Sequence, residues 1–389
     1  MPKPRVIVTC YPQSGHLHPL IPTARALADA GCPVLVATAA AEHAALAAAG
    51  LAAVDVGPGH AEASARVGEI MPEILAAPPP ARRAIGFSFL FGHVYASAVA
   101  DGLLERARSW RADVVLASVE SLAGPLVAAQ LGLPLVVSGF GTGLGTDVCA
   151  AATRAVAPLW ARAGLDVGEF AGVFDGLFVD PCPPSLRPRD VPNPRRSQSV
   201  QPARFDGVGE LPSLPARRPL IYVTFGTNPL FATPERFRTI ARAIAAAGAA
   251  AVLTGIDPGA LGNLPDGIVA HRFVPQSALL PYCDAVICHA GASTLLGALA
   301  NGLPLLAMPL GADHFANAAV AVRRGVAVAV ADGIDEPSLV AALARVLGDN
   351  AIRGAAAEVG AEIAAMPTPA AAADGILSWL GERLASRPS

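Results

Sequence analysis

Short runs of apolar residues alternate with longer amphipathic stretches through the first half of the chain. The apolar runs lie at residues 5–10, 33–38, 113–117 and 134–138, and the helical stretches at residues 17–30, 41–49 and 122–131. Strands that are apolar at every position are typical of a parallel sheet whose two faces are both covered by helices. The pattern therefore predicts an α/β fold.

A proline-rich segment separates this half from a second half with the same alternation. Residues 179–219 contain ten prolines. Because proline fixes φ and removes a backbone N–H donor, this segment is neither a helix nor a central strand. Beyond it, strands are expected at residues 220–225, 251–254, 284–288, 304–308 and 326–330, and helices at residues 234–247, 292–300 and 335–384.

The two halves predict two domains. The first is expected at residues 1–205, the proline-rich connection at about residues 180–218, and the second domain at residues 219–366. Pro367 and Pro369 interrupt the last helical stretch, so residues 367–389 are expected to form a separate C-terminal helix. The length of 389 residues suits two domains of roughly 150 residues each.

Composition narrows the classes of function. Hydrophobic residues make up 53% of the chain, so it can bury large cores, and the net charge of −3 without a Lys/Arg cluster argues against nucleic-acid binding. No apolar run approaches the roughly 20 residues of a membrane helix, and no signal-peptide pattern is present. Six cysteines without Cys-x-x-Cys spacing fit a reducing compartment, so we expect a cytoplasmic protein without membrane insertion.

Residues 288–294 form the most informative loop of the second half, because they leave an expected strand and open an expected helix. A helix start presents unpaired N–H groups and a partial positive charge. Gly291 lets a ligand approach the backbone, while His289, Ser293 and Thr294 add donors. The loop therefore suits a pyrophosphate, although an ordinary N-capped turn has the same pattern.

Two further loops follow strands. Residues 224–228 carry Gly226 and Thr227 and could contact the same phosphates, or could be a plain turn. In the first half, His16 follows a strand and could accept a proton from a hydroxyl, although a single histidine is more often a structural hydrogen-bonding group. Residues 139–145 are glycine-rich but fail the Gly-x-Gly-x-x-Gly spacing, so they indicate a loop beside an acceptor pocket.

Four motifs appear in order along the chain: Gly15-His16-Leu17-His18-Pro19, Phe273-Val274-Pro275-Gln276, His289-Ala290-Gly291-Ala292-Ser293-Thr294 and the segment from Pro309 to Asn317. Through them the chain resembles the bacterial natural-product glycosyltransferases of the UDP-glycosyltransferase superfamily, whose fold is called GT-B. The resemblance covers nearly the whole chain. It implies two facing Rossmann-like domains with an interdomain cleft, an acceptor-binding first domain, a nucleotide-sugar-binding second domain, and a final helix that crosses back to the first.

The resemblance also implies a role for each motif. His16 is the expected general base. Residues expected to bind the nucleotide-sugar donor are Thr227, Phe273, Val274, Gln276, His289, Gly291, Ser293, Thr294, Asp313 and His314. Within this set, the segment from Phe273 to Gln276 would meet the nucleotide base, and Asp313 would contact sugar hydroxyls.

Three positions depart from the family pattern. The acid that orients the base in many relatives is replaced by Ser118, which leaves either Glu120 as the acidic partner or a base without one. The sugar-facing Gln is His314. The Glu that holds both ribose hydroxyls in UDP-using relatives is Gly297. Because a thymidine nucleotide lacks the 2′-hydroxyl, we expect a dTDP-sugar in preference to a UDP-sugar.

The expected reaction is a single inverting displacement that moves a sugar onto a small hydrophobic aglycone, such as a polyketide. Side chains expected to line the acceptor pocket are Phe87, Phe91, His93, Phe140 and Trp160, although each could be an ordinary core residue. The sequence contains no pair of acidic residues of the kind that binds a metal–diphosphate complex, so we expect neither a metal nor a cofactor. The sequence leaves a homodimer open.

Two other functions stay open. A nucleotide-sugar epimerase can share this fold and would act on the donor alone. A non-catalytic helper that binds a nucleotide or a partner transferase is the second alternative, and Ser118 at the family's acid position is its support.

Overall fold

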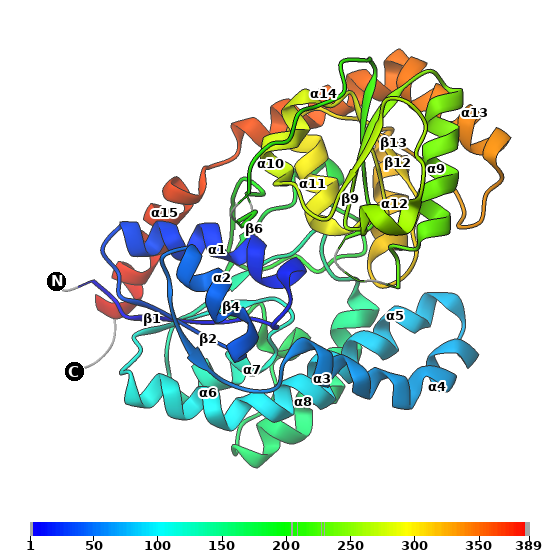
Figure 1. Cartoon of the computed structure of the whole chain (residues 1–389). Coiled ribbons are helices and arrows are strands. Elements are labelled where there is room, and N and C mark those ends of the chain that lie inside the picture. Colours follow the sequence, from blue (N-terminus) through cyan, green and yellow to red (C-terminus); the bar gives the residue numbers. More distant parts are fainter. Residues whose placement is uncertain (1–2, 204, 208, 227, 229, 386–389) are drawn as a thin grey trace. The chain divides into compact units, whose positions relative to one another are not determined.

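The computed structural model describes residues 3–203, 205–207, 209–226, 228 and 230–385, which form two compact units (Figure 1). Unit 1 comprises Met1–Cys182, Pro188–Phe205 and Pro367–Ser389, and unit 2 comprises Pro183–Arg187 and Asp206–Met366. The chain thus returns to unit 1 after completing unit 2. In Figure 1, each unit contains a sheet with helices on both faces.

In the described part of unit 1, seven strands form one sheet. They are β1 (Val6–Thr9), β2 (Val34–Thr38), β3 (Ala52–Asp55), β4 (Val114–Ser118), β5 (Leu135–Ser138), β6 (Leu177–Asp180) and β7 (Ser197–Ser199). Their order is β3-β2-β1-β4-β5-β6-β7, and every neighbouring pair is parallel. The helices are α1 (Ser14–Asp29), α2 (His43–Ala48), α3 (His60–Ala65), α4 (Met71–Ala76), α5 (Pro79–Phe87), the π-helix η3 (Ser88–Ala96), α6 (Ser97–Ser109), α7 (Ala123–Leu131), α8 (Thr146–Arg162) and α15 (Pro369–Ala385).

Both faces of this sheet are buried. Successive residues of a strand point to opposite faces. Ile7 and Val115 belong to a core with residues of α6, α7 and α8, whereas Val8 and Leu116 belong to a core with residues of α1 and α15. Since neither face meets water, the central strands consist of unbroken apolar residues, as the sequence pattern predicted.

Unit 2 repeats this architecture in its described residues. The strands are β8 (Leu220–Thr224), β9 (Ala250–Thr254), β10 (Ile268–His271), β11 (Ala285–Cys288), β12 (Leu305–Ala307) and β13 (Ala327–Ala329). Their order is β10-β9-β8-β11-β12-β13, again all parallel. The helices are α9 (Pro234–Ala246), α10 (Gln276–Leu279), α11 (Ala292–Ala300), α12 (His314–Arg324), α13 (Glu336–Gly348) and α14 (Asn350–Ala365).

The strand order fixes where a ligand can bind in each unit. In each sheet, the first strand lies beside the fourth, and the chain then winds outward in both directions. At such a switch point, the loops after the two strands diverge and leave a crevice at the carboxyl ends. The pairs are β1 with β4 in unit 1, and β8 with β11 in unit 2. His16 and Glu120 follow the first pair, and His289 follows β11.

A proline in α1 holds the end of the connecting segment on unit 1. Pro22 has no N–H to bond the carbonyl of His18 four residues earlier. That carbonyl instead accepts a hydrogen bond from the backbone N–H of Phe205, at 3.1 Å. The carbonyl of Pro367 accepts a similar bond from Gln201, at 2.8 Å. The chain on either side of the long segment of unit 2, at Phe205 and at Pro367, is therefore tied to unit 1 by backbone hydrogen bonds.

Several element boundaries differ from the sequence-based expectation. Helix α1 begins at Ser14 and not at residue 17, so Pro19 lies inside the helix. The strands β3, β7 and β10 were missed because they lie at sheet edges, where exposed or polar positions interrupt the apolar run. Strand β6 was also missed, since it adjoins the proline-rich segment.

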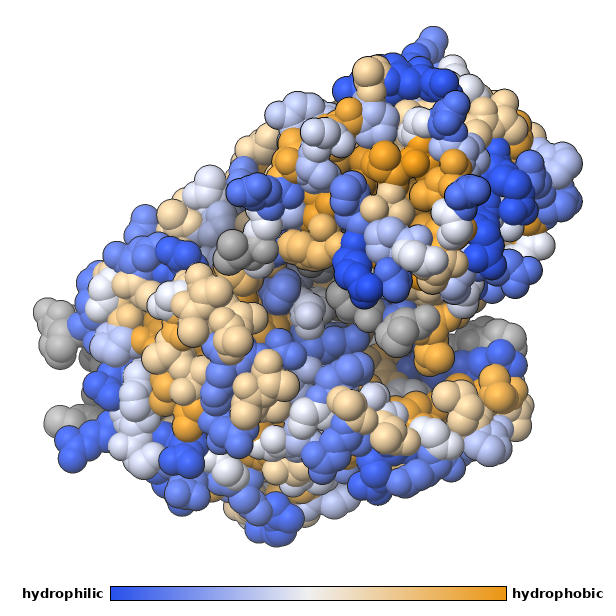
Figure 2. Space-filling view, viewed as in Figure 1, coloured by the Kyte–Doolittle hydropathy of each residue, from blue (hydrophilic) through white to orange (hydrophobic). Residues whose placement is uncertain are grey.

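One helical stretch is longer and more apolar than expected. Residues Ala81–Ser109 are continuous through α5, η3 and α6, and by length and composition alone they could cross a membrane. The expectation that no apolar segment reaches this length is therefore wrong. Phe91, Tyr95 and Leu103 from this stretch pack into the core of unit 1, which accounts for its apolar character. Apolar side chains also reach the surface over α4 and α5 (Figure 2), where Leu75 is exposed.

Candidate active site

His16 and Glu120 form a close pair at the switch point of unit 1. His16 lies in the first turn of α1, and Glu120 lies in the loop after β4. The Nδ1 atom of His16 is 3.1 Å from Oε1 of Glu120, whose side chain is only 2% exposed. Ser118 is the last residue of β4 and is also buried. An acidic group therefore lies beside the imidazole although the family's acid position is a serine.

Small and polar residues bring the loop of Glu120 close to β1. A Cβ on Gly124 would lie 2.6 Å from Cβ of Ala117 and 3.1 Å from Cγ2 of Thr9, so only glycine lets the start of α7 approach both strands. The hydroxyls of Thr9 and Ser121 are hydrogen-bonded at 3.0 Å, which joins the end of β1 to the loop after β4. These contacts fix the position of Glu120 relative to α1.

Aromatic rings surround the imidazole of His16. Phe140 stacks against it with ring centroids 5.1 Å apart, and Tyr11 and Phe91 each meet it edge-on at 5.5 Å. Phe87 packs on Phe91 at 4.7 Å. Three of the aromatic residues expected to line an acceptor pocket are thus grouped around His16, and their apolar surface restricts the orientation of the ring.

Two other acceptor candidates lie elsewhere in unit 1. Trp160 is 4% exposed and packs against Gly172 in the core. His93 is exposed on η3, beside Phe89. A helical stretch displays its side chains in several directions, so nearness in sequence to Phe91 did not bring His93 to the same place.

Tyr11 and His60 were missed by the sequence analysis. Tyr11 is fully buried, and its hydroxyl is 3.0 Å from Nδ1 of His60, at the start of α3. Burial, with a further contribution from His16, lowers the pKa of His60. Tyr11 comes two residues after β1, a position that could have indicated it. No local signal links His60 to β1.

In unit 2, the start of α11 follows β11 directly. Gly291 is the N-cap of α11 and offers no side-chain acceptor to the first N–H groups of the helix. These groups and the helix dipole favour an anion at this point. Thr294 is buried and Ser293 is half-buried in the first turn. The predicted phosphate motif is therefore a helix N-terminus with hydroxyl groups beside it.

His289 and His314 lie against each other near this helix start. Their ring centroids are 4.4 Å apart and the rings meet edge-on. Burial lowers the pKa of His289 to about 4, with a smaller contribution from His314, and burial lowers the pKa of His314 to about 4 as well. Both imidazoles are therefore neutral at physiological pH, so each ring carries a single N–H and no charge.

A buried amide joins the loops that carry these residues. The side-chain N–H₂ of Asn317 donates to the carbonyl of Ala290 at 3.0 Å and to Oδ2 of Asp313 at 2.7 Å. Ala290 and Ala312 both have positive φ, at 64° and 48°, a backbone conformation that residues other than glycine rarely adopt. The loops after β11 and β12 are thus strained and held together beside the helix start.

The expected nucleotide-base segment lies at the start of α10. Val274 and Gln276 are buried, whereas the ring of Phe273 is 56% exposed. A Cβ on Gly297 would be 3.6 Å from Oε1 of Gln276, so these two positions are neighbours. Thr227 lies outside the described residues.

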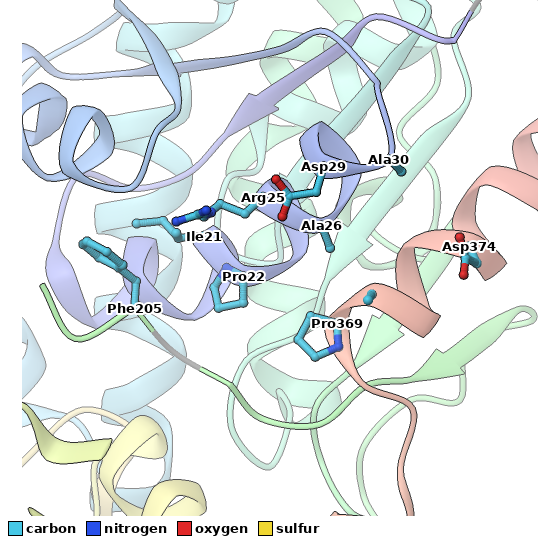
Figure 3. A pocket seen from close by; sticks show the side chains of 10 residues that line it. Ile21, Pro22, Arg25, Ala26, Asp29, Ala30, Phe205, Pro369 and Asp374 are labelled. Carbon is cyan, nitrogen blue, oxygen red and sulfur yellow. The ribbon is translucent and has the colours of Figure 1, made fainter. Parts of the chain in front are cut away.

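The described residues form no group of metal ligands at this site, and one open pocket of unit 1 lies away from it. Within the described part of the chain, no three His, Cys, Asp or Glu side chains are grouped so that they could hold a metal ion. An open pocket between α1 and α15 is lined by Arg25, Asp29, Phe205 and Asp374, among others (Figure 3). None of the residues expected to bind donor or acceptor lines this pocket.

The two parallel sheets, each with its switch-point residues, define a glycosyltransferase of the GT-B fold. SnogD from Streptomyces nogalater, a glycosyltransferase of known structure, matches with a TM-score of 0.80 and 31% identity over 97% of this chain and all of that one. The spinosyn rhamnosyltransferase SpnG, solved with thymidine diphosphate, matches with a TM-score of 0.78 and 27% identity over 96% of this chain and 99% of that one.

The sequence comparisons identify the family. Residues 25–201 match the N-terminal domain and residues 243–378 the C-terminal domain of the Erythromycin biosynthesis protein CIII-like proteins. The L-demethylnoviosyl transferase of Streptomyces niveus is 30% identical over 96% of this chain and 97% of its own length. The chain belongs to the Erythromycin biosynthesis protein CIII-like family of glycosyltransferases.

The buried histidines predict a sensitivity to acid. The pKa of each histidine in the folded protein, about 4, lies below the ordinary value of 6.5. At a pH between these two values, the unfolded chain therefore binds more protons than the folded protein does. Their contribution to stability is complete above pH 6.5 and is lost as the pH falls through this window. We expect the melting temperature to fall between pH 6.5 and 4.5, and to fall less in His314→Gln, in which one of the two groups cannot titrate.

Calorimetry at several pH values measures this difference, with His43→Gln in unit 1 as the matched control. Equal slopes in wild type and His314→Gln would contradict the prediction.

Proposed function

We propose that this glycosyltransferase transfers a sugar, with inversion, from a dTDP-sugar to a hydrophobic aglycone, and that His16 is its general base. The distance of 3.1 Å between Nδ1 of His16 and Oε1 of Glu120 carries the proposal. A carboxylate at this nitrogen orients the imidazole and stabilises the imidazolium that forms when the ring takes a proton. Glu120 thus takes the role of the acid that Ser118 cannot supply.

The reaction is one displacement at the anomeric carbon. The acceptor oxygen forms its bond to this carbon while its proton passes to Nε2 of His16, and the bond between carbon and diphosphate oxygen breaks. The electron pair leaves with the diphosphate. Preorganised donors stabilise such developing charge. The N-terminus of α11, with Ser293, Thr294 and the neutral imidazole of His289, supplies these donors in unit 2.

The acceptor binds to unit 1 in this proposal. Phe87, Phe91 and Phe140 group around His16 and offer aromatic surface to a hydrophobic aglycone, for which a polyketide is a suitable class. An aromatic environment also excludes water, which would otherwise compete with the acceptor for the donor sugar. A transferase is favoured over an epimerase because the relatives of this chain are named as transferases.

The donor preference rests on Gly297 and on the thymidine diphosphate in the SpnG structure. Gly297 adjoins Gln276 of the proposed base segment and has no carboxylate for a ribose 2′-hydroxyl. We propose that the transferred sugar is a deoxysugar. We also propose that the enzyme works in the cytoplasm and that its reaction needs no divalent metal ion.

Substitutions of the proposed base and its partner test the mechanism. His16→Ala and Glu120→Gln should each lower kcat by about 10²–10⁴-fold, while dTDP binding in unit 2 stays at the wild-type level. Ser118→Ala is the control and should retain activity, because a serine hydroxyl cannot stabilise the imidazolium as a carboxylate does. Steady-state kinetics and dTDP titrations measure both quantities. An active His16→Ala variant would refute the role of this residue.

The base preference can be measured by thermal shift. At equal concentration, a ligand that binds the folded state more tightly raises the melting temperature further, so dTDP should stabilise the wild type more than UDP does. Gly297→Glu adds the carboxylate and should increase stabilisation by UDP, whereas the control Gly297→Ala should not. Equal stabilisation of the wild type by both nucleotides would remove the argument from Gly297.

A chelator tests the independence from metal. We expect transferase activity to be unchanged after dialysis against EDTA, and added Mg²⁺ to leave kcat within about twofold, because the proposed charge stabilisation uses N–H and O–H donors. Loss of activity that Mg²⁺ restores would contradict this part of the proposal.

A further inference from the structure

The imidazole of His289 is enclosed by its neighbours. A Cβ on Gly291 would lie 2.3 Å from its Nε2, and a Cβ on Gly226 would lie 3.0 Å from its Cε1. The ring of Phe231 is nearly parallel to it at 6.3 Å, and His314 meets it edge-on at 4.4 Å. The residue is 7% exposed. Nε2 therefore lies near Gly291, which is the N-cap of α11.

His314 is itself fixed in one orientation. Its Nδ1 accepts a hydrogen bond from the backbone N–H of Gly311 at 3.2 Å, and the backbone N–H of His314 donates to the carbonyl of Gly311 at 3.0 Å. Since Nδ1 is an acceptor and the ring is neutral, the ring proton is on Nε2. Phe231 packs edge-on against the ring at 5.1 Å. One tautomer and one ring plane thus face His289.

The helix that carries His314 is also joined to the loop of His289. Asn317, one turn further along α12, donates to the carbonyl of Ala290, the residue after His289. The same amide holds Asp313, the residue before His314. The ring contact between the two histidines is therefore supported by hydrogen bonds on both sides, and a shift of His314 would be transmitted to His289.

We infer that His314 is a positioning residue, which fixes the imidazole of His289 for contact with the donor's diphosphate, and is not itself a ligand of the sugar. Its Nδ1 is occupied by the backbone N–H of Gly311, and its ring packs edge-on against His289. A glutamine side chain at this position could not provide the flat ring edge that packs on His289. The inference rests on the donor site proposed above. It adds His314 to that site as a residue that acts through His289.

Two ligands separate this role from a direct contact with the sugar. We expect His314→Gln to weaken the binding of dTDP and of dTDP-glucose by the same factor, about tenfold, because both carry the diphosphate. His314→Phe keeps the ring edge and should lose less than His314→Gln. A loss of dTDP-glucose binding with unchanged dTDP binding would overturn the inference in favour of a sugar contact. Isothermal titration gives both constants.

A double-mutant comparison tests whether His314 acts through His289. In a His289→Asn background, His314→Gln should cause no further loss of dTDP binding, since the group that it positions is absent. An undiminished further loss would overturn the inference. The nitrogen-15 spectrum of the His289 imidazole, recorded without ligand, should change in His314→Gln and not in the control His43→Gln. An unchanged His289 spectrum would also overturn it.

Failure of the proposed donor site would look different. If dTDP did not bind the wild type at all, the proposed function would fail, whereas the His289 spectrum would still report the contact with His314. Melting curves without ligand show whether each variant is folded.

Discussion

The neighbouring position of the first and fourth strands in each sheet is the constraint on which the candidate residues of each unit depend. Parallel strands end at the same edge of a sheet, and at this pair the chain turns away to both sides. His16 and Glu120 are 3.1 Å apart only because β1 and β4 are hydrogen-bonded neighbours. The pairing of β8 with β11 likewise brings Gly226 against the ring of His289.

The two units treat buried ionisable groups in different ways. In unit 1, the carboxyl group of Glu120 is buried beside an imidazole that can take up a positive charge, so the pair is suited to a reaction that forms an imidazolium. In unit 2, burial keeps both His289 and His314 neutral. Neutral hydrogen-bond donors can stabilise a diphosphate without first having to be protonated. Their charge also stays the same when the diphosphate leaves.

Sequence reasoning located several candidate residues after strands, because strand–loop–helix motifs are recognisable locally. His16, His289 and Thr294 lie after strands as predicted, and Glu120 was named as one of two alternatives; their functional roles stay predictions. His93 and Trp160 show the limit, since aromatic character and nearness in sequence do not say which way a helix turns a side chain. His60 is more instructive, because its contact with Tyr11 joins segments 49 residues apart.

The sequence by itself determined the two α/β halves and the loops that carry the chemistry, because apolar periodicity and strand–loop–helix motifs are local properties. Only the tertiary structure decided that Glu120 is the partner of His16 and that His314 packs on His289. These contacts depend on which strands are neighbours and on which glycines let the backbone approach, as at Gly124 and Gly291. Such packing is set by the whole sheet, so no single segment of the chain contains it.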